Sequence, residues 1–568
     1  MPRFDSYPVI YWLLVYGLCW GVLWLTSWVR VSRRVFLIAA IGLLFLLRLP
    51  SIVYNYEINP DESQMITQAL TLRHDPVYFQ SVDGTTGGPL DSYFLILPSL
   101  IGLPFDYITA HLTAFCLLAI SLWLLYGTAS LWFGEDSARL ALLPLVFVLG
   151  LTQNGDFLHY NSELVPLLLL SSSCYLYATL TFQNRPQTWR IALIGCLLGM
   201  VPFGKLQAVP MVGVIGLFVA LLVVMSRGLT VSAKVSRLAA LIVGGVSFPL
   251  LFVGLCWING VYDDFVTFYL IGNLRYGSDT NQLLSILRLP AFFRKGDSFD
   301  WFIKLAVFIG VVGAILAWRR SKRVGTDLWK QIGFAVTLLL ATLFAITRTG
   351  SEYVHYLFFL AGPLLFISAY GWQHIRQNFS NNRWVPIGIM GLFLVLFGAQ
   401  AAYKRLNAIP LNLYSSEQQE GWTIQQSAVS KEIAKYAQPG EKLAVWGWRC
   451  DYYVQAQMPQ GVAENHTIRS GFGHPMQPIY QKRYVSDFMR SSPPVFIDAV
   501  GSHNLWMNDR KTQGHELIKP LGQYVATHYR YVGLVDDTRI YVRNDRAKAG
   551  LRYPEKPLSK DISLLTEN

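Results

Sequence analysis

Charged residues and cysteines are scarce in this sequence. Asp, Glu, Lys and Arg make up only 14% of the 568 residues, whereas 53% of the residues are hydrophobic. With a mean hydropathy of +0.34, this composition excludes an ordinary soluble enzyme and indicates a protein that crosses a membrane several times. Only Cys450 among the six cysteines lies outside an apolar segment, so neither a disulfide framework nor a zinc cluster is expected.

Nucleotide-binding motifs are also missing. No P-loop and no Rossmann fingerprint occurs anywhere in the chain. The net charge of +12 resides in short loops between apolar segments, where Lys and Arg determine membrane topology, so no nucleic-acid partner is expected. The N-terminal apolar stretch lacks a small-residue cleavage site, and we therefore interpret it as a retained helix.

The apolar runs predict the membrane spans. About twelve runs approach or exceed the roughly 20 residues that a spanning helix needs. They are 8–28, 35–54, 106–131, 137–151, 161–182, 190–203, 206–225, 238–258, 301–318, 329–346, 355–372 and 384–403. A further run, SYFLILPSLIGLP, is shorter and contains two prolines, so we interpret it as a re-entrant or interfacial segment.

Basic residues predict the orientation. If the short run does not cross, the basic clusters between spans fall on one side, which the positive-inside rule makes cytoplasmic. These clusters are Arg30/Arg33/Arg34, Arg185/Arg190, Arg227/Lys234/Arg237, Arg319/Arg320/Lys322/Arg323 and Arg376/Arg383. The chain is then a multi-pass protein of the inner (plasma) membrane, with a long first loop, 55–90, and the C-terminal tail on the extracytoplasmic side.

The tail, residues 404–568, is polar and mixed in composition. KEIAKYAQPGEKLAVWGW is typical of a helix, a Pro-Gly turn and a buried strand, and PPVFIDAV and TRIYVRN are typical of further strands. The predicted fold class is therefore a polytopic α-helical membrane protein of about 12 transmembrane helices, residues 1–403, with a C-terminal soluble α/β domain, residues 404–568. Trp446 and Trp448 of this domain are either core residues or part of a binding pocket.

Two adjacent acids follow the second apolar run, in the stretch NPDESQ. Asn59 and Pro60 suit a helix start, and Asp61 and Glu62 would favour the positive end of the helix dipole. Capping does not require both acids, and ionisable groups at a membrane exit tend to mark function. Adjacent helical residues point about 100° apart, so one carboxylate is expected to face a substrate while the other pairs or caps. Asp61 is the first candidate and Glu62 the second.

A second polar constellation is TQNGDFLHYNSE. Asp156, His159 and Glu163 recur there at spacings that share one helical face. Asp156 is the further catalytic candidate, and His159 and Glu163 are candidates for other contacts in the site. The three side chains could hold a divalent cation, but the sequence assigns no metal ligand. The alternative is a polar helix start that Asn161 or Ser162 caps.

Basic candidates come from two other turns on the same predicted face. Lys205 in PFGKLQAVP stands between apolar runs with no other charge nearby, and Arg348 and His355 flank the turn RTGSEYVHY. A lone lysine at a membrane edge also occurs as a snorkelling anchor. Three such groups on one face with carboxylates fit a phosphate or pyrophosphate site better. Tyr353 and Tyr356 of the same turn are candidates for acceptor contacts.

In order and topology these motifs resemble those of the GT-C glycosyltransferases. The resemblance rests on the acidic motif in a long first loop, GGPLDSYFLI before the short apolar run, the acidic second turn, the lone lysine, HYLFFLAGPL and, in the tail, VWGWRCDYYVQAQMP. Within this class, the motifs resemble those of bacterial protein mannosyltransferase-like proteins and lipid A aminoarabinose transferases.

The resemblance implies a GT-C fold and the transfer of a sugar from a polyprenyl-phosphate donor to a glycan, lipid or protein hydroxyl. Asp61 or Glu62 would be the general base of an inverting reaction, and Lys205, Arg348 and His355 would hold the lipid-phosphate leaving group. No cofactor is implied beyond the lipid-linked donor, with a divalent cation left open.

One segment departs from the family pattern. Many relatives carry Lys-Pro-Pro-Leu where this chain has Gly87-Gly88-Pro89-Leu90, so the basic residue is missing, and Asp83 and Asp91 flank the gap. Two other functions stay open. One is a transporter or flippase of lipid-linked saccharides, although no inverted repeat is visible. The other is an O-antigen ligase or polymerase that uses a pyrophosphate-linked donor.

Overall fold

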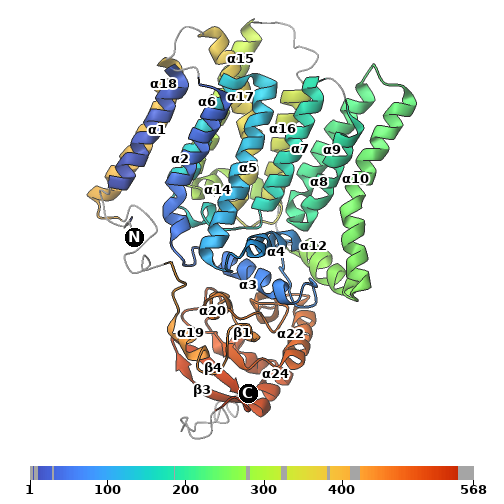
Figure 1. Cartoon of the computed structure of the whole chain (residues 1–568), viewed down its shortest axis with the longest axis vertical. Helices are drawn as coiled ribbons and strands as arrows, with labels where there is room; N and C mark the ends of the chain where they lie inside the picture. Colours follow the sequence, from blue (N-terminus) through green and yellow to red (C-terminus); the bar gives the residue numbers. More distant parts are fainter. Residues whose placement is uncertain are drawn as a thin grey trace. The chain divides into compact units, whose positions relative to one another are not determined.

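The chain divides into two compact units in the computed structural model, which describes residues 4, 10–28, 31–183, 186–276, 282–320, 329–379, 384–409 and 422–547 (Figure 1). The helical unit comprises Met1–Met65 and Gly84–Ile424, and the sheet unit comprises Ile66–Asp83 and Gln425–Asn568. The sheet unit thus includes a part of the predicted first loop in addition to most of the predicted C-terminal domain.

The helical unit holds the membrane-spanning part of the chain. Among the described residues, ten helices are long and apolar enough to cross a membrane. They are α1 (Ile10–Trp28), α2 (Arg33–Val53), α5 (Tyr107–Phe133), α7 (Leu164–Gln183), α9 (Val209–Met225, extended by η4, Leu206–Ala208), α10 (Val231–Ile258), α15 (Ser298–Arg320), α16 (Phe334–Thr347, preceded by the π-helical η6, Trp329–Gly333), α17 (Ala361–Asn378, preceded by η7, Val354–Leu360) and α18 (Trp384–Leu406).

Two further helices complete the twelve predicted runs. They are α6 (Glu135–Leu151) and α8 (Thr188–Met200), which continues into η3 (Val201–Phe203). Every predicted apolar run therefore corresponds to a helix where the structure describes it, apart from Tyr54, Asp106 and residues 161–163 at the ends of their runs. Together with the small sheet of the second unit, this confirms the predicted fold class, a polytopic helical membrane protein with a C-terminal α/β domain.

Local sequence sets the helix starts and the closest helix contacts. Asp106 precedes α5, and its Oδ1 accepts a hydrogen bond from the Thr109 backbone N at 2.9 Å. Helices α8 and α10 approach through glycines, because a Cβ on Gly195 or Gly244 would lie 2.2 or 2.1 Å from a carbonyl oxygen of the facing helix. Small residues at the contact let two membrane helices pack backbone against backbone.

The short apolar run is helical but not long. It forms α4 (Pro89–Ile96) and the 3₁₀ turn η1 (Leu97–Ile101), and Gly102 ends it with a φ of 86°. These helices of 8 and 5 residues fall short of the roughly 20 residues of a full span. Other short helices are η2 (Gly155–Phe157), α11 (Tyr262–Asp264), the π-helical η5 (Phe265–Ile271), α12 (Gly272–Arg275), α13 (Gln282–Leu287) and α14 (Leu289–Lys295).

The sheet unit contains a four-stranded sheet in the order β1-β2-β4-β3. Strand β1 (Leu443–Trp446) is parallel to β2 (Val495–Asp498), and β4 (Thr538–Arg543) pairs antiparallel with β2 and with β3 (Tyr529–Val535). The helical elements are α19 (Ala428–Ile433), α20 (Asp451–Ala456), α21 (Ile468–Gly471), α22 (Gln477–Ser491), α23 (Arg510–Gln513), η9 (His515–Leu517) and α24 (Lys519–His528). Trp446 is 1% exposed, and its indole N–H donates to the Gln513 carbonyl at 2.8 Å, so this tryptophan is a core residue.

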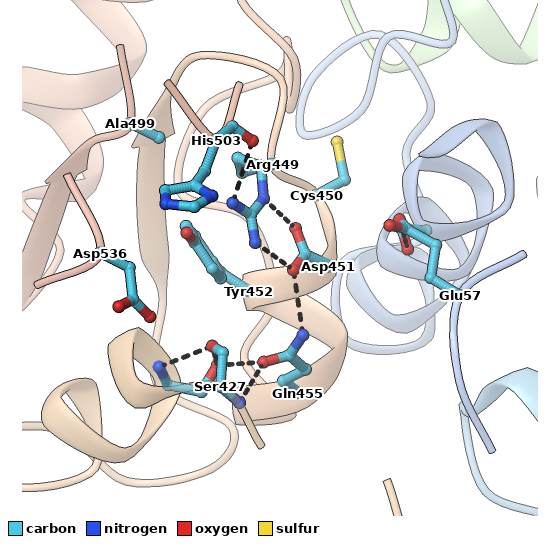
Figure 2. Close-up of polar contacts among 12 residues, drawn as sticks. Glu57, Ser427, Arg449, Cys450, Asp451, Tyr452, Gln455, Ala499, His503 and Asp536 are labelled. Atoms are coloured by element: carbon cyan, nitrogen blue, oxygen red, sulfur yellow. Dashed lines mark hydrogen bonds and ion pairs between the residues drawn. The ribbon is translucent and has the colours of Figure 1, made fainter. Parts of the chain in front are cut away.

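The segment between β1 and α20, which contains Trp448, is held by a polar network (Figure 2). The guanidinium of Arg449 donates two hydrogen bonds to the Asp451 carboxylate, both at 2.9 Å. Gln455 donates to the same carboxylate at 3.0 Å and accepts from the Ser427 backbone N at 2.9 Å. The network joins the starts of α19 and α20.

Residues 66–83 are built into the sheet unit by buried polar contacts. Gln460 Nε2 donates to the Ser81 carbonyl at 3.0 Å, and the Gln460 backbone N donates to Thr71 Oγ1 at the same distance. Arg483 forms an ion pair with Asp83, whose side chain is 1% exposed. Helix α3 (Pro60–His74) begins in the helical unit, and its residues from Ile66 onward belong to the sheet unit.

Candidate functional site

The first turn of α3 separates the two adjacent acids. The Asn59 side chain accepts a hydrogen bond from the Asp61 backbone N at 3.0 Å and so caps the helix. Glu62 turns back toward the chain: its Oε1 accepts from the backbone N–H groups of Ile58 and Asn59. Its Oε2 lies 2.9 Å from His111 Nε2, and both side chains are fully buried. Glu62 therefore has the capping role that the sequence left open.

Asp61 occupies a different environment. Its side chain is half-buried, and the structure shows no hydrogen bond or ion pair from its carboxylate to another described residue. The carboxylate is close enough to Lys205 for its negative charge to contribute to the raised pKa of that lysine. Asp61 is thus an accessible carboxylate at the edge of a charged cluster, as the 100° separation from Glu62 predicts.

Asp156, in η2, connects three segments. Its Oδ1 accepts from Asn59 Nδ2 at 3.0 Å, and its Oδ2 accepts from the Val354 backbone N at 3.1 Å. The same Oδ2 lies 3.6 Å from His355 Nδ1. Burial opposes ionisation of this carboxyl, but the imidazole of His355 outweighs it and lowers the pKa of Asp156 to about 2. Asp156 therefore carries a negative charge and aligns the α3 cap with the start of η7.

Lys205 and Glu163 form a buried ion pair. Lys205 Nζ lies 2.9 Å from Glu163 Oε1 and donates to Ser162 Oγ at 2.6 Å, and the two charged side chains are 6% and 0% exposed. Burial alone would lower the pKa of Lys205, but the charge of Glu163 raises it. Burial likewise would raise the pKa of Glu163, and Lys205 lowers it. Both groups are held in their charged forms, so Lys205 is not a snorkelling anchor.

Aromatic residues enclose the cluster from the η7 side. Tyr353 stacks on the His355 imidazole with 5.5 Å between ring centroids, and His355 Nε2 lies 3.9 Å from Glu163 Oε2. The Lys205 ammonium lies 5.4 Å from the centroid of the Tyr356 ring. The predicted residues Asp156, His159, Glu163, Lys205 and His355 thus come together from three turns, and we call them the polar cluster.

Part of the polar cluster could hold a metal ion. One ligand atom from each of Asp156, His159 and His355 lies within 4.8 Å of the others. His159 Nε2 and His355 Nδ1 are buried and have no hydrogen-bond partner among the described residues. Two imidazoles and one carboxylate are donors that suit zinc and other first-row divalent ions. The sequence grouped Glu163 with Asp156 and His159 as possible metal ligands. In the structure His355 is the third possible ligand, and Glu163 pairs with Lys205 instead.

Arg348 differs in exposure from the other basic candidates. It is exposed at the C-terminal end of α16, whereas Lys205 and His355 are buried. His111, which engages Glu62, is a site residue that the sequence analysis missed. It lies 49 residues from Glu62 inside an apolar run, where a lone histidine gives no pattern to recognise.

The Gly87-Gly88 segment packs directly against the turn that carries Lys205. The Gly88 backbone N donates to the Gly204 carbonyl at 2.7 Å, and a Cβ on Gly88 would lie 2.0 Å from the Phe203 carbonyl oxygen. Of the two acids that flank the missing lysine, Asp83 pairs with Arg483. Asp91 accepts a hydrogen bond from the Gly88 backbone N at 3.2 Å and so helps to cap the N-terminus of α4. Both acids therefore have structural contacts.

These features define a multi-pass membrane protein with a charged, mostly buried cluster beside the ends of its apolar helices. No protein-family model and no curated protein matches the chain. Among solved structures, the chain is similar to ArnT from Cupriavidus metallidurans bound to undecaprenyl phosphate, with 12% identity, coverage of 90% of this chain and 98% of that chain, and a TM-score of 0.48.

A second similar structure is the oligosaccharyltransferase of Archaeoglobus fulgidus in complex with zinc and sulfate. The identity is 12%, the match covers 89% of this chain and 73% of that chain, and the TM-score is 0.40. Both proteins are GT-C membrane glycosyltransferases, the class that the sequence motifs resemble. At TM-scores below 0.5 the similarities carry no function over to this chain.

Proposed function

We propose that the chain is an inverting glycosyltransferase that moves a sugar from a polyprenyl-phosphate donor to a hydroxyl acceptor at the extracytoplasmic membrane surface. The observation that carries the proposal is the contrast between two neighbours: Glu62 is fully engaged by His111 and backbone N–H groups, whereas Asp61 is half-exposed beside the polar cluster. A general base must be accessible to the proton it removes.

Asp61 takes the proton of the acceptor hydroxyl. The hydroxyl oxygen attacks the anomeric carbon, the new C–O bond forms, and the bond from that carbon to the phosphate oxygen breaks with inversion. The polyprenyl phosphate leaves as an anion, which needs fixed positive charge nearby. Lys205 and His355 are the buried groups of the polar cluster that can supply it.

Lys205 already has a counter-ion, and this constrains how the donor binds. Its ammonium donates to Ser162 and pairs with Glu163, so one of its three protons stays available for a phosphate oxygen. Glu163 then holds the lysine in position, and Arg348 adds charge from the exposed side. Tyr353 and Tyr356 line the acceptor side of the cluster, next to His355.

A divalent cation could take the place of a protonated His355 in the same cluster, because an imidazole that binds a metal ion is neutral. Asp156, His159 and His355 would hold it, and it would supply Lewis-acid stabilisation of the leaving phosphate. The chain's own contribution is to keep Asp156 ionised and to hold both imidazoles in place.

The test is transfer of radiolabelled sugar from a polyprenyl-phosphate donor in membranes with matched amounts of wild type, Asp61→Asn and Glu62→Gln. Asp61→Asn should lower turnover by about 10²–10⁴-fold, the usual contribution of a general base, while the donor still binds. Glu62→Gln should retain turnover in proportion to the folded protein. Equal turnover by all three proteins would contradict the assignment of Asp61 as the base, and absence of transfer by the wild type with the donor still bound would favour a transporter.

A further inference from the structure

The carboxyl end of β2 in the sheet unit carries a second cluster of metal-ligating side chains. Asp498 is the last residue of β2 and faces His515 and Glu516 in η9. His515 Nδ1 lies 2.8 Å from Asp498 Oδ2 and 3.4 Å from Glu516 Oε2. One ligand atom from each of the three residues lies within 4.8 Å of the others. The carboxyl ends of parallel strands such as β1 and β2 are where α/β sheets bind ligands.

Each carboxylate has one oxygen fixed by a donor and turns the other toward His515. Asp498 Oδ1 accepts from the Val500 backbone N at 3.1 Å. Glu516 Oε1 accepts from Arg539 Nη1 at 2.6 Å, and Arg539 stands opposite Asp498 in the β2–β4 register. Metal sites in proteins have this arrangement, in which outer hydrogen bonds orient the inner ligands.

Hydrogen bonding alone does not explain why the carboxylates of Asp498 and Glu516 both point toward His515. The Nδ1 atom of an imidazole carries at most one proton, so it can donate to only one of the two carboxylates with good geometry. The ligand separations of 2.8 and 3.4 Å approach those around a tetrahedral ion, where donors about 2.1 Å from the metal lie about 3.4 Å apart.

We infer that Asp498, His515 and Glu516 bind a first-row divalent metal ion of the zinc class, independently of the proposed transferase chemistry. The ligand atoms are Asp498 Oδ2, His515 Nδ1 and Glu516 Oε2, so the imidazole binds the ion as the neutral tautomer that carries its proton on Nε2. Asp498 and His515 are buried, but the Glu516 side chain is 23% exposed and gives water access to the fourth position. The ion ties η9 to the end of the sheet.

The test uses the full chain in detergent, stripped of metal and titrated with Co²⁺, whose visible absorption reports a tetrahedral site, and then with Zn²⁺ in competition. Because Asp156, His159 and His355 offer another cation site, every variant is made in an Asp156→Asn background. The parent should show the Co²⁺ bands, Glu516→Gln should weaken binding by at least about tenfold, and His515→Ala should abolish it.

Glu441→Gln is the matched control. Glu441 is also a partly exposed acid of the sheet unit that pairs with an arginine, Arg546, at 2.5 Å, so its replacement removes a comparable ion pair without touching the cluster. Metal binding should be unchanged in this variant. Absence of Co²⁺ bands in the parent, or equal binding in the Glu516→Gln variant, would overturn the assignment and leave Asp498 and His515 as a structural hydrogen-bonded pair. Limited proteolysis confirms that each variant is folded.

Discussion

Glu62 Oε2 lies 2.9 Å from His111 Nε2, and neither side chain is exposed to solvent. The pair joins the start of α3 to α5 in the helical unit. Because Glu62 also accepts backbone hydrogen bonds from Ile58 and Asn59, its carboxylate is a structural anchor for the turn that presents Asp61.

Removing either partner of this pair should lower stability more than removing the Asp61 charge. Glu62→Gln or His111→Ala leaves a buried polar group unsatisfied, which costs about 1–3 kcal/mol of unfolding free energy. Asp61→Asn changes a half-exposed group and should cost within about 0.5 kcal/mol. Thermal unfolding in detergent compares the three variants. If Glu62→Gln had a wild-type midpoint but no transferase activity, Glu62 rather than Asp61 would be the base.

Neutralising Lys205 and Glu163 together should preserve the stability of the protein but not its transferase activity. Lys205→Met leaves Glu163 charged and buried, and breaking a buried ion pair costs about 3–5 kcal/mol. Lys205→Met with Glu163→Gln removes both charges and should recover most of that loss. Sugar transfer should stay low in the double variant, because the phosphate still lacks its cation. Full activity in a stable double variant would exclude Lys205 from donor binding.

Two neighbouring glycines provide a steric test of the turn that carries Lys205. A Cβ at position 88 would lie 2.0 Å from the Phe203 carbonyl oxygen, whereas a Cβ at position 87 would meet no atom closer than 3.5 Å. Gly88→Ala should therefore destabilise the protein by at least about 1–3 kcal/mol, the usual cost of overpacking, and lower transfer.

Gly87→Ala is the matched control and should be close to neutral in both unfolding midpoint and transfer. An equal loss in the two variants would mean that backbone freedom, and not contact with Phe203, explains the glycines.

The sequence predicts the membrane helices well because lipid requires long apolar runs whose backbone groups are satisfied internally. It also predicts that only one of Asp61 and Glu62 remains accessible, since this follows from helix geometry. Pairings across long stretches of chain are different. Asp83 pairs with Arg483 across a separation of 400 residues, and neither local sequence contains a pattern that predicts this pairing. The three turns of the polar cluster could be assigned to one face from topology, but the partnership of Lys205 with Glu163 needs the fold.

Glu464 should make the stability of the sheet unit depend on pH. Its side chain is 2% exposed, with Oε2 accepting from Ser470 Oγ at 2.5 Å and Oε1 from the Arg469 backbone N at 2.9 Å. Burial raises the pKa of Glu464 to about 7, against an ordinary value of 4.5, although Ser470 and Arg483 oppose the shift. The folded state thus binds this proton more tightly than the unfolded chain.

The stabilisation from that proton is complete below pH 4.5 and is lost as the pH rises through 7. Its size is on the order of 3 kcal/mol, from about 1.4 kcal/mol per pKa unit. Glu464→Gln stays neutral at every pH, so its advantage over the wild type should grow between pH 5 and pH 8. Hydrogen exchange of the sheet-unit amides in the full chain measures this difference, with Glu441→Gln as the partly exposed control. Because both proteins share every other titrating group, parallel pH profiles would mean that Glu464 is already ionised in the folded state.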